Sequence, residues 1–313
     1  MDPIILFFIF GLFAGILKSE LRLPSQIYDF VSMLLLITIG LKGGIELAKQ
    51  PFLSLLPQII TVIIAGFTLP LLIYPVLRYL GKFDRANAAS IAAHYGSVSV
   101  GTFAVATAYM HANNILYEEH MALFVVLLEI PAILVGIVLA KGLSKDINWS
   151  NVTNEVMLGK SVMLLIGGLL IGWISGPEDI ASISPLFFDL FKGVLALFLL
   201  EMGLITAMQL GSLKRYGFFL LVFGVLTPVV FASIGIGLGI VIGLSAGGTT
   251  ILATLFASAS YIAVPASMRI AVPEANPTLS LTASLGITFP FNIILGIPIY
   301  YYSSNYLYSL LTL

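Results

Sequence analysis

The chain has 313 residues, of which 59% are hydrophobic and 9% are charged, and its mean hydropathy is +1.08. This composition excludes a soluble domain and is typical of a helical protein that crosses a membrane many times. The net charge of −1 argues against a nucleic-acid partner, and a sequence without cysteine has no disulfide or thiolate chemistry.

Ten apolar stretches are candidates for membrane spans. They cover about 4–17, 26–47, 52–79, 86–112, 119–143, 157–175, 186–209, 216–243, 247–270 and 278–303. Their length and continuity distinguish them from the short alternating strands of a β-barrel. The first stretch is preceded by one charge, that of Asp2, and lacks the basic segment of a signal peptide, so we expect it to be a span.

Basic residues predict the orientation of these spans. The loops after odd-numbered spans carry most of them, including Arg78, Lys82, Lys214 and Arg215, whereas the loops after even-numbered spans carry little beyond Lys49. The positive-inside rule therefore places the odd-span loops in the cytoplasm and both termini outside.

The two halves of the chain resemble each other at an offset of about 160 residues. The segment 34–41 (LLLITIGL) is echoed by 197–204 (LFLLEMGL), and Pro131 corresponds to Pro290. Each half holds five spans, an odd number, so the second half is expected to be inserted upside down. The predicted architecture is an all-α membrane protein of two inverted five-helix repeats, 1–143 and 156–313, joined by a cytoplasmic linker at 144–155.

Two spans are interrupted by small and hydroxylated residues. The fourth contains Gly-Ser-Val-Ser-Val-Gly-Thr at 96–102, and the ninth contains Ala-Ser-Ala-Ser-Tyr-Ile-Ala-Val-Pro at 257–265. Proline disrupts a helix, and broken backbone inside a bilayer survives where protein or a water-filled cavity satisfies its polar groups. Paired broken helices in the two halves predict a transporter's binding site, formed by discontinuous helices four and nine that cross.

The breaks predict a pocket that binds a small anion, because two half-helices would start there with unpaired N–H groups. Ser97 and Ser99 are expected to cap the second half of span four, and Ser258 and Ser260 the second half of span nine. The carbonyl ends of the first half-helices would suit a cation. The predicted substrate-binding residues are Gly96, Ser97, Val98, Ser99, Thr102, Ser258, Ala259, Ser260 and Tyr261. The alternative is that these small residues let helices pack closely, with no ligand.

Polar residues at depth are the next candidates. Glu129, Thr288 and Asn292 are predicted to bind the coupling cation, although a buried structural glutamate is an equal alternative for Glu129. His94 is interpreted as a packing residue or as a proton-coupling group. Lys42 and Glu46 are expected to form a solvated or snorkelling pair near the outer surface.

Enzyme chemistry has no support in the sequence, so we expect a protein that is not an enzyme and has no cofactor. No nucleotide-binding loop or nucleophile–base constellation is present, and the three histidines lack metal spacing. We expect no metal beyond sodium. A channel is harder to exclude, but channels seldom need inverted repeats with crossing broken helices.

Both interrupted motifs resemble those of the sodium-dependent bicarbonate permease family, known from cyanobacteria and many other bacteria. The family's fourth-span break, Gly-Ala-Val-Ser-Gly-Ser-Thr, is similar to 96–102. Its ninth span and the following Pro-x-Ala-Asn-Pro turn are similar to 257–269 and 273–277. Segments 39–44 and 296–300 also look like family text, so the match covers nearly the whole chain.

The resemblance implies a fold similar to bile-acid symporters and sodium/proton antiporters. It implies a core and a gate domain, each drawn from both repeats, that slide against each other in a homotrimer. The implied location is the bacterial inner (plasma) membrane. A PII-like cytoplasmic regulator is a further family partner, but the short 144–155 linker gives it little support.

One departure from the family concerns the coupling ion. Tyr261 stands where the family has an aspartate, which the resemblance assigns to sodium binding. A phenol keeps an oxygen but gives up the charge. The expected function is sodium-dependent uptake of a small anion, bicarbonate by resemblance. The alternatives are a proton-coupled or uncoupled carrier of another small organic anion, and a membrane sensor that does not transport.

Overall fold

The computed structural model of the protein describes residues 3–49, 51–118, 120–142 and 157–311, together with 150 and 154. Within these ranges every regular element is a helix. The expected linker 144–155 lies outside the described residues apart from the two isolated positions.

The helices follow one another in chain order with short connections. The first are α1 (Pro3–Ile16), α2 (Ser25–Ala48), η1 (Phe52–Leu55), α3 (Leu56–Pro75), η2 (Val76–Leu80), α4 (Arg85–Gly96), α5 (Val100–Ala112) and α6 (Met121–Lys141). The next are α8 (Lys160–Ile180), η3 (Ala181–Ile183), η4 (Pro185–Asp189), α9 (Phe191–Val241), α10 (Ala246–Ala257) and α11 (Ala263–Ala271). The last are α12 (Pro277–Leu281), η5 (Thr282–Thr288), α13 (Phe289–Phe291), η6 (Asn292–Gly296) and α14 (Ile297–Leu311).

Seven helical stretches in the described part of the chain are long and apolar enough to cross a membrane. They are Ser25–Ala48, Leu53–Leu80, Met121–Lys141, Lys160–Ile183, Phe191–Gly211, Gly217–Val241 and Pro277–Leu311. The chain is therefore a multi-pass membrane protein. The count of ten spans stays a prediction, because α1 is short and the expected fourth and ninth spans are each divided in two.

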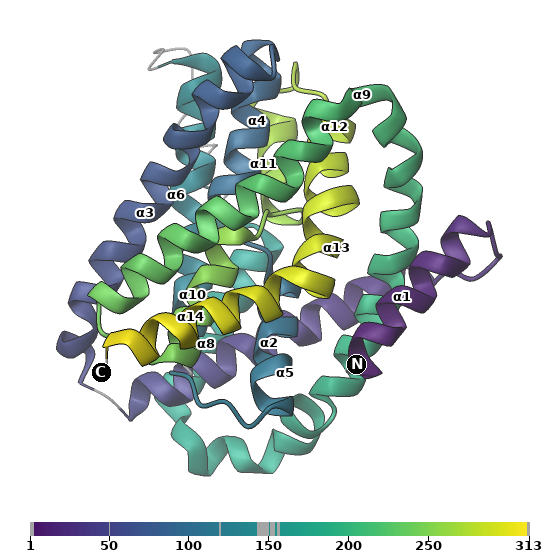
Figure 1. Cartoon of the computed structure of the whole chain (residues 1–313). Helices are drawn as coiled ribbons and strands as arrows, with labels where there is room; N and C mark the ends of the chain where they lie inside the picture. The colour runs from purple at the N-terminus through teal and green to yellow at the C-terminus, as the bar shows by residue number, and fades with distance from the viewer. Residues whose placement is uncertain are drawn as a thin grey trace.

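Helix α9 contains two of these stretches, separated by a bend. Gly217 has φ 80° and ψ 177°, a conformation that lies outside the helical region and that glycine adopts without steric cost. Figure 1 shows the helix turning over one end of the molecule at this bend. Its two arms correspond to the expected spans 186–209 and 216–243.

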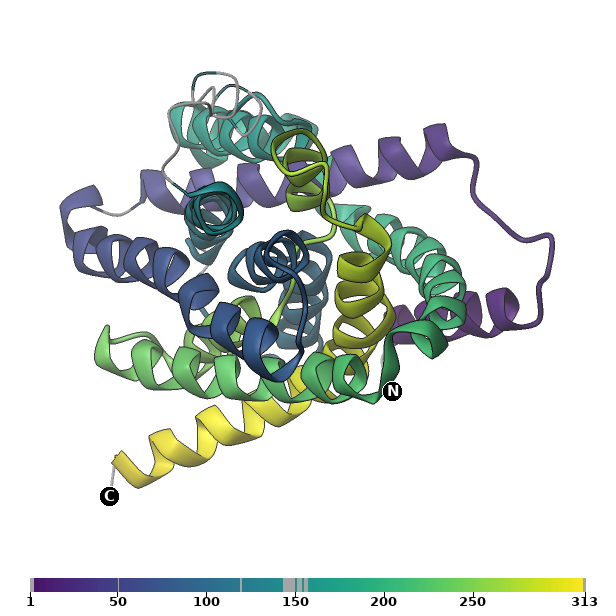
Figure 2. The same ribbon diagram turned by 90° about the horizontal axis from the view of Figure 1, so that it is seen from above.

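Helices α2 and α8 pack along a stripe of glycines, and Figure 2 shows them running side by side. A Cβ added to Gly44 would lie 2.1 Å from the carbonyl oxygen of Leu169, and one added to Gly172 would lie 2.4 Å from that of Leu41. Such contact requires glycine, which lets membrane helices approach backbone to backbone. The small residues of this pair serve packing alone.

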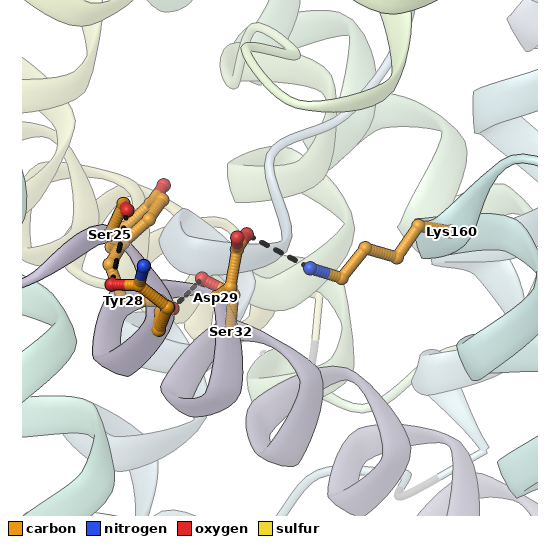
Figure 3. A network of polar contacts seen from close by, with 6 residues as sticks. Ser25, Tyr28, Asp29, Ser32 and Lys160 are labelled. Carbon is orange, nitrogen blue, oxygen red and sulfur yellow. Dashed lines mark hydrogen bonds and ion pairs between the residues drawn. The ribbon is translucent and has the colours of Figure 1, made fainter.

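An ion pair also joins α2 and α8, as Figure 3 shows. Lys160 Nζ lies 2.9 Å from Asp29 Oδ1, and one turn along α2 the Ser32 hydroxyl donates to the Tyr28 carbonyl at 2.8 Å. Both charged side chains are about half exposed, and exposed pairs contribute about 0–1 kcal/mol. This exposed pair therefore contributes little to holding the helices together.

Candidate functional site at two helix breaks

Both expected helix breaks are present in the structure. Helix α4 ends at Gly96 and α5 begins at Val100, while α10 ends at Ala257 and α11 begins at Ala263. The intervening backbone is extended at Ser97 and Ser258. Pro265 lies in the first turn of α11 and not in the break itself, a position where a missing N–H costs little.

The two breaks touch although they lie far apart in the sequence. The Ser260 N–H donates to the His94 carbonyl at 2.8 Å, and His94 Nδ1 lies 2.6 Å from the Ser260 carbonyl oxygen. Since a carbonyl only accepts, Nδ1 carries the hydrogen. The Ser99 N–H donates to Ser258 Oγ at 2.9 Å. Helix α4 lies beside α11, and α5 packs against α10, so the two divided segments cross at their breaks (Figure 1).

The start of α5 is the best-defined helix end at this crossing. Ser99 Oγ accepts from the Thr102 N–H at 3.0 Å and from the Thr102 hydroxyl at 2.9 Å, which confirms the predicted cap. The N–H groups of Val100 and Gly101 have no partner among the described residues. This helix end therefore presents two free donors and the positive end of its dipole to the breaks.

Ser97 and Ser258 do not act as predicted, and Ser260 accepts from the start of α11 only at long range. Ser258 Oγ donates to the Leu255 carbonyl at 2.7 Å, so Ser258 closes α10 and holds the Ser99 N–H instead of capping α11. Ser260 Oγ lies 3.4 Å from the Val264 N–H, a long contact, and Ile262 precedes α11 with an apolar side chain. Ser97 ends α4 through its backbone N–H. The predicted caps were wrong for Ser97 and Ser258. The partners of these side chains depend on the neighbouring helices, which a local sequence pattern does not reveal.

Two buried hydroxyls at the crossing make no hydrogen bond of full geometry among the described residues, although one of them, that of Tyr261, lies near the Ser99 side chain. They belong to Ser97 and Tyr261, and these residues are 1% and 8% exposed to solvent. The Tyr261 hydroxyl lies against the first turn of α5, because a Cβ on Gly101 would be 2.2 Å from it. The Tyr261 ring packs edge-on against Phe289, with centroids 5.3 Å apart. Buried donors without partners are rare in folded proteins, and a bound ligand or water is one way in which they are satisfied.

The remaining predicted residues complete the walls of the crossing. Gly96 packs against Pro70, since a Cβ there would lie 2.2 Å from the proline Cγ. Val98 and Ala259 are buried inside the breaks, and Thr102 is buried in the first turn of α5. Sequence reasoning missed Gly101 and Phe289, both in contact with Tyr261. Gly101 lies inside the quoted motif and was detectable there, whereas Phe289 is far from it in sequence.

The three predicted cation ligands do not share a hydrogen-bond network in the described structure. Thr288 Oγ1 donates to the Gly224 carbonyl at 2.7 Å and pairs with the Tyr95 hydroxyl at 2.6 Å. The Asn292 amide donates to the Ala257 carbonyl at 2.8 Å, while its oxygen accepts from Tyr300 at 2.7 Å. Glu129 is buried and accepts a hydrogen bond from the Ser161 hydroxyl at 3.4 Å. Its second carboxylate oxygen has no partner among the described residues.

A multi-pass helical protein whose divided helices meet at buried, unpaired hydroxyls has the construction of a membrane transporter. The comparison with family models agrees. Residues 3–305 match the family described as the Na+-dependent bicarbonate transporter superfamily, and the chain belongs to that superfamily. A search of curated proteins finds no match.

Proposed function

We propose that this protein is a secondary active transporter that carries a small anion, bicarbonate, into the cell together with sodium. The observation that carries this proposal is the start of α5. There the N–H groups of Val100 and Gly101 have no partner among the described residues, and the Tyr261 hydroxyl lies against Gly101 in the buried crossing of two divided helices. Membership of the sodium-dependent bicarbonate transporter superfamily supports the same substrate and ion.

The donors at this crossing suit an anion with several oxygen acceptors. A buried polar group without a partner costs roughly 1–3 kcal/mol. A planar anion such as bicarbonate would accept from the N–H groups of Val100 and Gly101 and from the hydroxyls of Ser97 and Tyr261, which removes that cost. The positive end of the α5 dipole adds attraction for the charge. Ser99, Thr102, Ser258 and Ser260 would then position the site without touching the ion.

Sodium coupling depends on which oxygen atoms and charges are available to bind the cation. A hard cation is bound by oxygen ligands and a compensating charge, and Tyr261 supplies no charge. Thr288 and Asn292 already use their oxygens in hydrogen bonds, whereas Glu129 keeps one carboxylate oxygen available. We therefore propose that sodium coupling is weak, with Glu129 the best of the three candidate ligands.

We also propose for this protein the arrangement inferred from the sequence. It comprises two inverted five-helix repeats, both termini outside, a homotrimer and insertion in the bacterial inner membrane. The pairing of α4 with α11 and of α5 with α10 supports the inverted repeats. A PII-like regulator is left out of the proposal because the linker that would bind it is short.

Uptake of labelled bicarbonate into proteoliposomes, with and without an inward sodium gradient, tests this function. Sodium-stimulated uptake is the expected result. Uptake that is driven by a proton gradient, or that needs no gradient, would favour the alternative of a proton-coupled or uncoupled carrier. His94 gives the proton-coupled alternative little support, because its ring nitrogen is hydrogen-bonded to the Ser260 carbonyl. No uptake of bicarbonate or of small carboxylates would favour a sensor.

A further inference from the structure

A groove with a volume of about 770 Å³ lies among the ends of four helical segments. Its lining comes from α1 and the start of α9, which include Phe7 and Leu197, and from the end of α5 and the start of α14. Helices α1 and α9 are packed tightly, because a Cβ added to Gly11 would lie 2.0 Å from the Leu200 carbonyl oxygen. Figure 1 shows the start of α1, marked N, beside α9. The groove therefore follows the line where this closed helix pair meets α5 and α14.

The groove is polar at one end and apolar along its length. Its charged lining residue is Lys192, the second residue of α9, and its lining also includes Asn113, which directly follows α5. Both residues lie at helix ends, as does Pro3 at the start of α1, so they mark the end of the groove at the membrane surface. Leu197 is about 7.5 Å farther along α9 than Lys192. Phe7 and Leu197 are each 41% exposed, so the apolar part of the groove is open to the bilayer.

Lys192 has no counter-ion in the described part of the chain. The residue is exposed, and neither of the ion pairs found there includes it. The acidic residue closest in sequence, Asp189, lies three positions earlier and makes no ion pair with it. A lysine carries its ammonium on an apolar stem that reaches along a protein surface to the polar headgroups, and there it attracts anionic lipids. A phosphate from outside the chain would thus meet an unpaired positive charge at this end of the groove.

Acyl chains fit this groove better than a hydrated anion does. A hydrated ion would exchange water for apolar walls at a high cost, whereas a lipid tail is as apolar as leucine. The volume lies in the range of about 300–1,000 Å³ that is typical of mostly apolar ligand pockets with a few polar groups. A cavity of about 10 Å³ shares Ile4, Ile5 and Tyr109 with the groove and reaches Val105 of α5. It has room for no more than one water molecule, so the groove is not a route for bicarbonate to the start of α5.

We propose that this groove binds an anionic phospholipid of the surrounding membrane. The phosphate lies at Lys192, and an acyl chain runs along the groove past Phe7 and Leu197. The two parts of the ligand follow from the two parts of the groove, because one positive charge selects an anionic headgroup and the apolar walls select an acyl chain. The site is separate from the helix breaks, and it does not depend on which ion the protein transports.

The first test changes the charge. Purified full-length protein is incubated with equal amounts of phosphatidylglycerol and phosphatidylcholine, and the retained lipids are counted by native mass spectrometry. The native protein is expected to retain phosphatidylglycerol about fivefold more than phosphatidylcholine, the preference that one lysine at a membrane surface provides. Lys192→Gln should lose this preference. Lys141→Gln should keep it, because it removes another exposed lysine that has no ion pair in the described structure and lies outside the groove. A preference that persists in Lys192→Gln, is lost equally in Lys141→Gln, or is absent from the native protein overturns the proposal.

The second test fills the groove. Gly193 and Gly211 both lie exposed on α9, and a Cβ added to either has no described atom within 4 Å, but Gly193 lines the groove and Gly211 does not. Gly193→Phe is expected to reduce retained phosphatidylglycerol by one molecule per chain, whereas Gly211→Phe should retain as much as the native protein. Thermal unfolding of every variant checks that the protein is folded. Equal lipid retention by the two phenylalanine variants overturns the proposal. If Gly193→Phe dissociates an oligomer in the same spectra and retains its lipid, a second copy of the chain covers the groove and the lipid site is wrong.

Discussion

Two regions of this protein are built from small residues, and they use them in opposite ways. Along α2 and α8 the glycines bring backbone against backbone, so that a Cβ at Gly168 would lie 2.7 Å from the Ile37 carbonyl oxygen. At the crossing of the breaks, serines and glycines leave two hydroxyls buried without partners among the described residues. Between α2 and α8 the backbones fill the space, whereas at the breaks polar groups remain for a ligand to bind. Small residues in membrane helices therefore indicate a binding site when their polar atoms are left unpaired, and packing when the space is filled.

The largest effect is expected where the packed region is overfilled. Gly168→Val should lower the free energy of unfolding by about 3 kcal/mol, because its side chain meets the α2 backbone, which cannot move aside. Gly167→Val is the matched control on the same helix, since a Cβ at Gly167 has no described atom within 4 Å. Thermal unfolding in detergent compares them. Equal unfolding temperatures for the two variants would contradict the glycine-packing account.

The next effect separates the two kinds of serine at the breaks. Ser258→Ala removes the acceptor of the buried Ser99 N–H and should cost about 1–3 kcal/mol of stability. Ser97→Ala removes a hydroxyl without a partner, so it should leave stability nearly unchanged and reduce anion uptake. Measuring unfolding and uptake for both variants sharpens the comparison. If Ser97→Ala unfolds as easily as Ser258→Ala, the Ser97 hydroxyl has a structural partner and is not reserved for a ligand.

Replacing Tyr261 tests whether the second region distinguishes ions. Tyr261→Asp restores a negative charge beside the breaks and should lower the sodium concentration needed for half-maximal uptake about tenfold, since a carboxylate attracts a cation strongly at low dielectric. Tyr261→Phe removes the hydroxyl alone and should weaken anion affinity without improving the response to sodium. Sodium titrations of uptake compare the three proteins. Tight sodium coupling in the native protein, abolished by aspartate, would mean that the tyrosine itself serves the cation.

The smallest effect is expected at a cap on the membrane surface, which contrasts with the Ser99 cap inside it. Asp84 accepts from the Asn87 N–H at 2.9 Å at the start of α4. Partial burial opposes ionisation of this carboxyl, but the hydrogen bonds from Asn87 outweigh it and lower the pKa of Asp84 below its ordinary 3.8. Asp84→Ala should cost about 1 kcal/mol, and Asp84→Asn should keep most of the cap.

The same cap carries a pH dependence with a definite sign. Because the pKa is lower in the folded protein, the ionised form contributes stability above pH 3.8, and that contribution is lost as the pH falls through the folded-state pKa. Unfolding curves of native protein and Asp84→Ala at pH 7 and pH 3 should therefore differ most at pH 7. A gap that widens at pH 3 would rule out the charged cap.

Several features of this protein were determined by the sequence itself, because they depend on neighbours along one helix. The apolar stretches, the two breaks at 97–99 and 258–262, and the Ser99 cap on Thr102 follow from hydropathy and from contacts within one turn. The motifs around 96–102 and 257–269 also indicated the family that residues 3–305 confirm.

Tertiary structure alone decided what the two breaks do for each other. Ser258 binds the Ser99 N–H, His94 binds the Ser260 carbonyl, and the Tyr261 hydroxyl lies against Gly101. These partners are 159 or more residues apart, so no local pattern predicts which donor meets which acceptor. For the same reason no local pattern predicts that Phe191 meets Lys42, because it reaches the lysine from another helix. Helix ends and breaks are local properties of the chain, whereas the pairing of buried polar groups depends on which helices the membrane-embedded packing brings together.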